Sequence, residues 1–212
     1  MNERDKNLAE GDSSGGYHHG DLRSALVAAA GRLLEAEGLA AVSLRHVARA
    51  AGVSHAAPYR HFRDKHELLE AVAAEGFRDL EGRLEEIVRR LPDQPREQFL
   101  ELGTTYVDAV LSHPHRSHLM FGGFLDPQRR SAELAAAEQS SFDGLVSVIR
   151  SAEASGLYRE IPMRDVILAL WSSAHGLAML AAAGKLEAFC GQADPRELGR
   201  RQVHLLLEGL AR

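Results

Sequence analysis

Hydrogen-bonding and basic side chains crowd one segment of the chain, residues 42–65, with the sequence VSLRHVARAAGVSHAAPYRHFRDK. The second half of this segment holds few large apolar residues, so closing a hydrophobic core does not explain its composition. Such side chains donate hydrogen bonds to phosphate oxygens and to acceptors at base edges. We therefore predict that this segment contacts double-stranded DNA. The expected contact residues are Ser43, Arg45, Ser54, His55, Ala56, Ala57, Tyr59, Arg60, His61 and Lys65.

The position of each residue indicates its task in that contact. A helix over the second half of the segment, once in the major groove, brings residues 55–57 close to base edges and lets residues 59–61 reach flanking phosphates. Ser43 and Arg45 open the preceding helix, where free backbone N–H groups and the helix dipole attract a phosphate. Lys65 lies at the start of the following helix, where the N-terminal N–H groups also attract a phosphate.

Short helices must hold these side chains in place. Apolar residues at helical spacing and turn residues between them predict helices over 21–38, 43–52, 54–62 and 65–91. Gly52 supplies a left-handed turn between the second and third helices, and the small Ala48 lets them cross closely, as a helix-turn-helix requires. The expected N-caps are Asp21, Ser43, Ser54 and Asp64, with Glu67 completing a capping box at the last.

Pro58 lies inside the third of these helices and must restrict it. It removes at most one helical hydrogen bond and restrains Ala57, so we expect this third helix to be short or distorted. Because Ala56 and Ala57 have no hydrogen-bonding tips, direct base readout must depend heavily on His55 and Arg45. Methyl contacts to thymine and readout of DNA shape supply the rest.

The charge of the chain is divided unevenly along its length. The net charge of -5 argues against a nucleic-acid partner when taken whole. Residues 17–66, however, carry seven Lys and Arg against four acidic residues, a sum of +3, and six of the eleven His. Residues 1–16 sum to -2 and residues 67–212 to -6. A basic head on an acidic body indicates one DNA-facing module.

The rest of the chain predicts more helices and no strand, so the expected fold class is all-α. Helices are expected near 96–112, 115–121, 127–154, 163–183 and 195–210, each bounded by Pro or Gly. Asp194 caps the last of them. We expect a disordered tail over 1–16, a helix-turn-helix domain over 17–66, and a larger helical domain over 67–212.

The segment that carries these features resembles the tetracycline-repressor (TetR) family of regulators, over about residues 20–70. The resemblance rests on Ser43, Val47-Ala48, Ala51-Gly52-Val53-Ser54, Tyr59, His61-Phe62, and Lys65 before Leu68-Leu69. It implies that the third helix is the recognition helix and that the remainder binds a ligand and dimerises. In the body, Trp171 with His175-Gly176 resembles the Trp-His-Gly signature of one C-terminal domain type in this family.

The body is a candidate site for a small-molecule effector. Trp171 and His175 lie four residues apart on one helical face, where they could line a cavity or simply fill the core. The same two interpretations apply to Met120, Phe121 and Phe142.

A homodimer is expected through the helices near 163–183 and 195–210, as the family implies. Two recognition helices about 34 Å apart then read a two-fold symmetric operator. We expect a repressor that an effector releases, with the helix over 65–91 as the lever between head and body. Two alternatives remain open: an activator or ligand-independent repressor, and a helical ligand carrier or enzyme whose head is vestigial.

Several other classes are not favoured. No paired carboxylates or nucleophile-base spacing indicates catalysis, and no cofactor motif is present. His113, His115 and His118 lack a recognisable metal spacing, so helix capping is the simpler use. No run of about 18 uninterrupted apolar residues predicts a membrane span, and the N-terminus lacks a secretory signal. A single cysteine, Cys190, forms no intrachain disulfide, so we expect a cytoplasmic protein.

Overall fold

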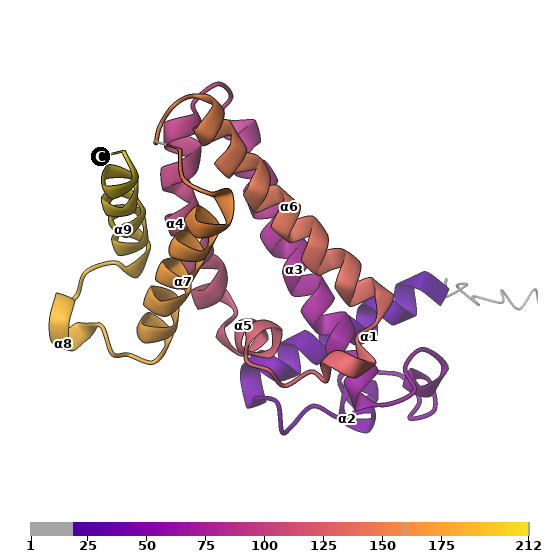
Figure 1. Ribbon diagram of the computed structural model, residues 1–212. Coiled ribbons are helices and arrows are strands. Elements are labelled where there is room, and N and C mark those ends of the chain that lie inside the picture. Colours follow the sequence, from indigo (N-terminus) through magenta and orange to yellow (C-terminus); the bar gives the residue numbers. More distant parts are fainter. Residues whose placement is uncertain (1–18, 159, 212) are drawn as a thin grey trace, which may run out of the picture.

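Helices account for all regular secondary structure in the part of the chain that the computed structural model describes, residues 19–158 and 160–211 (Figure 1). The expected all-α fold class is thereby confirmed, whereas the predicted tail over 1–16 lies outside the described residues. The helices are α1 His19–Glu37, α2 Leu44–Ala50, α3 Lys65–Arg90, α4 Pro95–Ser112, α5 Pro114–Phe121, α6 Ala132–Ala154, α7 Met163–Ala182, α8 Glu187–Cys190 and α9 Pro195–Leu210, with 3-10 turns η1 Pro58–Arg60 and η2 Pro127–Arg129.

Side-chain caps set the start of several helices, as the sequence predicts. Ser43 Oγ accepts a hydrogen bond from His46 N at 3.2 Å, and Asp64 Oδ1 accepts one from Glu67 N at 3.0 Å. Asp194 Oδ1 accepts one from Arg196 N at 2.9 Å. Each cap satisfies an N–H group that has no partner inside its helix.

Two helix boundaries depart from the sequence prediction near the N-terminus of the chain. The α1 helix begins at His19, before the predicted cap Asp21, whose side chain is not among those the structure describes. The predicted helix over 54–62 is wrong in extent: only η1, Pro58–Arg60, is helical there. Pro58 has no N–H group to bond to Ser54 O, so an α-helix that begins at Ser54 does not propagate through this position, although Ala57 keeps helical angles of φ −61° and ψ −45°.

The predicted helix over 127–154 is divided in two. After η2 the backbone extends, and Ser131 caps α6 by accepting from Leu134 N at 3.2 Å. The extended stretch is held against α3, where the buried Glu70 accepts from Ser131 N at 2.9 Å and His66 Nε2 accepts from Asp126 N at 3.0 Å. These long-range bonds satisfy two backbone N–H groups of the loop and fasten it to the base of α3.

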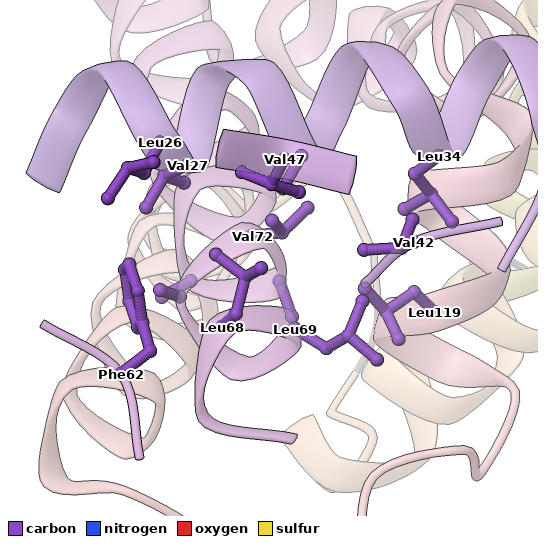
Figure 2. Packing of buried hydrophobic residues seen from close by; sticks show 14 of the residues in the cluster. Leu26, Val27, Leu34, Val42, Val47, Phe62, Leu68, Leu69, Val72 and Leu119 are labelled. Atoms are coloured by element: carbon purple, nitrogen blue, oxygen red, sulfur yellow. The ribbon is translucent and has the colours of Figure 1, made fainter. Parts of the chain in front are cut away.

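Helices α1, α2 and the first half of α3 enclose the core of the head. Figure 2 shows Leu26 on α1, Val47 on α2 and Leu68 on α3 pointing toward one another, with Phe62 at the edge. All four are buried. Leu119 on α5 completes this core, so α5 contacts the head although it belongs to the second half of the chain.

The body is built around α3, α4, α6, α7 and α9, with α6 lying along the length of α3 (Figure 1). Its core includes Phe99 and Ile149, both fully buried. Two glycines, Gly103 and Gly199, let α4 and α9 cross at very short range, because a Cβ at Gly103 would lie 2.3 Å from Gly199 O. The long α3 passes from the head core into the body core and so joins the two mechanically.

Candidate DNA interface and effector pocket

The predicted DNA-contact residues lie together on an uncovered end of the head. Figure 1 places α2 and the loop after it at the end of the molecule remote from α9. Three of the ten residues are half-buried, namely Ala57, His61 and Lys65. The other seven are exposed: Ser43, Arg45, Ser54, His55, Ala56, Tyr59 and Arg60.

A buried anchor holds the loop that presents most of these side chains. Pro58 and Phe62 are buried, whereas 54% of Tyr59 is exposed. Pro58 O accepts from both His61 N and Phe62 N at 2.9 Å, which closes a tight turn between the two buried residues. The Arg23 guanidinium stacks 5.3 Å from the centre of the Phe62 ring. The apolar sides of the loop therefore face inward and Tyr59 and Arg60 face outward.

Lys65 has a structural partner that its sequence position did not indicate. Its Nζ donates to Leu39 O at 2.7 Å, across the turn that follows α1. Two further exposed basic residues at this end of the head, Arg49 and Arg63, were not among the predicted contacts. Arg63 pairs with Glu67 at 3.1 Å, whereas Arg49 stands in the last turn of α2. The basic composition of residues 17–66 was the signal that could have included both.

A carboxylate of the head caps a helix of the body. Glu35, near the end of α1, accepts from Arg116 N at 2.8 Å and from His115 N at 3.2 Å, the first free N–H groups of α5. His115 Nδ1 also lies 3.1 Å from Glu35 O. Eighty residues separate these partners in the chain, so no local pattern could reveal the contact. The orientation of α5 is therefore tied directly to α1.

A second ion-paired seam joins the head to α6. Glu133 binds Arg23 of α1 at 2.5 Å and Arg78 of α3 at 2.6 Å. Burial alone raises the pKa of Glu133, but the hydrogen bonds from Arg78 and Arg23 outweigh it and the pKa is lowered. Glu133 is thus ionised at neutral pH and links three helices.

An apolar cavity of about 390 Å³ lies in the body between α3, α4, α5, α6 and α7. Four of the five predicted ligand-binding residues line it: Met120, Phe121, Phe142 and Trp171. The fifth, His175, lies outside the lining but within 5.4 Å of Phe121, ring centre to ring centre. The rest of the wall is mainly aliphatic, including Leu80, Leu102, Leu145, Ile167 and Leu170.

Tyr106 on α4, which the sequence did not single out, joins the polar groups at one end of this cavity. Its hydroxyl lies 2.8 Å from His175 Nδ1 and accepts from Trp171 Nε1 at 3.3 Å. Burial raises the pKa of Tyr106 to about 12, so the phenol stays protonated and donates to His175. Burial lowers the pKa of His175, which keeps the imidazole neutral. This end of the cavity is therefore polar but uncharged.

The α7 helix leaves much of its apolar surface outside the protomer core. Among the described residues it is the one helix long and apolar enough to cross a membrane by length and composition, and 22% of that stretch is buried. Leu168 and Leu180 are 58% and 50% exposed, and Leu205 on the adjoining α9 is 71% exposed.

Within the described residues, no group of three or more His, Cys, Asp or Glu side chains is placed to hold a metal ion.

The α2 helix, the turn at Gly52 and the short η1 element follow the order of a helix-turn-helix DNA-binding head, here joined to a helical body that contains a cavity. One family model matches the head and a second matches the body. Residues 26–72 match bacterial regulatory proteins of the tetR family, and residues 99–206 match the tetracyclin repressor-like C-terminal domain. The chain belongs to the TetR family of transcription regulators, which are in general DNA-binding proteins and not enzymes.

Solved structures share the fold over nearly the whole chain. A protein with unknown function from Rhodococcus sp. RHA1 is 36% identical, with 93% of this chain and 100% of that chain covered and a TM-score of 0.81. A TetR family transcription regulator from Marinobacter aquaeolei VT8 is 22% identical, with 90% and 95% covered and a TM-score of 0.66. The TetR family regulator PfmR from Thermus thermophilus is 22% identical, with 88% and 99% covered and a TM-score of 0.65. A search of curated proteins finds no match.

Proposed function

We propose that this protein is a cytoplasmic repressor that binds a palindromic operator as a homodimer and leaves it when a small molecule enters the body. The observation that carries the proposal is the exposed, polar and basic end of the head around Arg45, His55 and Tyr59. In a groove, His55 and Arg45 reach base edges and Tyr59 and Arg60 reach phosphates. Because η1 is only three residues long, shape readout contributes more than it does for a full recognition helix.

A second copy of the chain is the proposed cover for the apolar face of α7 and α9. Leu168, Leu180 and Leu205 would leave water on dimerisation. A lipid cover fits less well, since exposed Arg164, Asp165 and Ser172 interrupt the helix surface.

The proposed route from cavity to DNA runs through α5. Met120 and Phe121 line the cavity at one end of this eight-residue helix, and Glu35 of the head caps its other end. A ligand that pushes Met120 and Phe121 outward therefore moves α1 as well. Such a ligand releases the operator only to the extent that it binds the displaced arrangement more tightly.

Removing the cap tests this route. In Glu35→Ala, a cavity ligand found by thermal-shift screening should change operator affinity by less than about threefold, against about 5–150-fold in the native protein. The free energy of unfolding should fall by about 1 kcal/mol through the lost cap. Glu85→Ala, which removes an exposed carboxylate of α3, serves as the control. Native-like coupling in Glu35→Ala, measured by fluorescence anisotropy on labelled operator, would show that α5 does not carry the signal.

Selection from random DNA duplexes tests the function itself. The purified protein should enrich a two-fold symmetric sequence whose half-site centres lie one helical turn, about 34 Å, apart, or a multiple of it. Enrichment of a sequence without two-fold symmetry would contradict binding as a symmetric dimer. A reporter placed behind the selected operator should then be less active when the gene product is present, whereas increased activity would favour an activator.

A further inference from the structure

The charged residues that line the cavity cancel each other. Arg130 and Glu138 are the two charged side chains in its wall among the described residues, and they form an ion pair with each other. A ligand with a carboxylate or an ammonium would have to compete with that pair for its partner. The two side chains of this pair are part exposed, at 46% and 26%, and the other described residues of the wall are uncharged. An ion held away from the pair would therefore be buried without a partner, which is strongly unfavourable. The cavity is therefore built for an uncharged molecule.

One hydroxyl in the wall has a free hydrogen-bonding capacity. Ser141 on α6 lines the cavity and is 95% buried, since its exposed fraction is 5%. Its Oγ makes no side-chain hydrogen bond within residues 19–158 and 160–211, whereas the neighbouring Ser140 donates to Glu81. The Oγ atom remains accessible from the cavity, since Gln202 Oε1 is the buried side-chain polar atom without a partner among the described residues. A ligand group that pairs with Ser141 Oγ gains the modest affinity of one neutral hydrogen bond. At the other end, Tyr106, His175 and Trp171 already satisfy one another.

The size of the cavity limits the ligand. A cavity of roughly 150 Å³ accommodates benzene, and this one measures about 390 Å³. Scaling by volume gives a ligand of roughly ten to sixteen non-hydrogen atoms. Aromatic rings crowd one part of the wall, where Phe121 lies 5.9 Å from Trp171 and 5.5 Å from Phe77 between ring centres.

We propose that the effector is a neutral, predominantly apolar molecule of this size, whose single polar group, a hydroxyl or carbonyl, bonds to Ser141. This proposal rests on the proposed effector site and specifies its chemistry. The wall offers a hydrogen-bonding partner to one neutral polar group and no free partner to a charge, so fatty-acid anions and amines of the same length are excluded.

Direct binding of three matched probes tests the ligand class without any DNA. Trp171 lines the cavity and is the single tryptophan of the chain, so its fluorescence reports occupancy. Decan-1-ol, decanoate and decylammonium at pH 7, each below its aggregation limit, share one chain and differ in charge. Decan-1-ol should bind at least tenfold more tightly than either ion. Equal or tighter binding of an ion, or no binding by any probe, would overturn the proposal.

Ser141→Ala tests the polar contact. Decan-1-ol affinity should fall by about twofold to tenfold, which is the range of a single neutral hydrogen bond. Ser151→Ala, an exposed serine of the same helix, should leave it unchanged. Unchanged affinity in Ser141→Ala would refute the assigned contact. Because binding is measured on the protein alone, probes that bind with the proposed preference but leave operator affinity unaltered would instead contradict effector release, and so the two failures are distinguishable.

Discussion

Leu168→Asp should convert the protein into a monomer and weaken operator binding by about 100-fold or more. Leu168 is 58% exposed on α7, so the change costs little within the protomer. In the proposed dimer the new carboxylate would be buried in an apolar contact and would face its symmetry mate, since a two-fold interface presents the same patch twice. A monomer also loses the second half-site, which a palindromic operator requires for tight binding.

The assembly and the DNA affinity need separate measurements. Sedimentation equilibrium reports the mass of the particle, and a gel shift on the selected operator reports affinity. Val88→Asp is a matched control, because Val88 on α3 is similarly apolar and 41% exposed but lies on a different helix. A second variant, Leu205→Asp on α9, should behave like Leu168→Asp. If both variants remain dimers of native affinity, the proposed interface is wrong.

Arg45→Ala should weaken operator binding by about tenfold to 100-fold and reduce its salt dependence. Arg45 is exposed at the start of α2, where a phosphate or a guanine edge is within reach. Each phosphate contact adds about 0.9 to the slope of log affinity against log salt. Because each dimer carries two copies, the slope should fall by about 2 if the contact is to phosphate.

A titration at several salt concentrations distinguishes the possible results. A loss of affinity with an unchanged salt slope, and with relaxed selectivity at one base position, would assign Arg45 to base readout. Arg150→Ala removes an exposed arginine of α6 in the body and should have no effect on either quantity. If Arg45→Ala binds the operator with native affinity, the proposed contact of Arg45 on α2 with DNA is wrong.

Local chemistry explains why much of this architecture was predictable. Ser43, Asp64 and Asp194 cap their own helices within three residues in the chain, and Gly52 adopts φ +69° in the turn where a left-handed residue was expected. These interactions depend on neighbours in the sequence, so the sequence carries them directly. Pro58 indicated a restricted recognition element for the same reason, although the extent of the loss was underestimated.

The all-α class, most helix boundaries and the basic head were predictable, because they follow from periodicity, capping and charge along the chain. For Met120, Phe121, Phe142 and Trp171 the sequence left core and cavity wall as alternatives, and the packing of the helices places them at the cavity. The Glu35 cap on α5, the hydrogen bonds of Tyr106 to Trp171 and His175, and the place of Ser141 in the cavity wall depend on how helices far apart in the chain pack together. Such contacts are set by packing of whole helix faces, which no local pattern encodes.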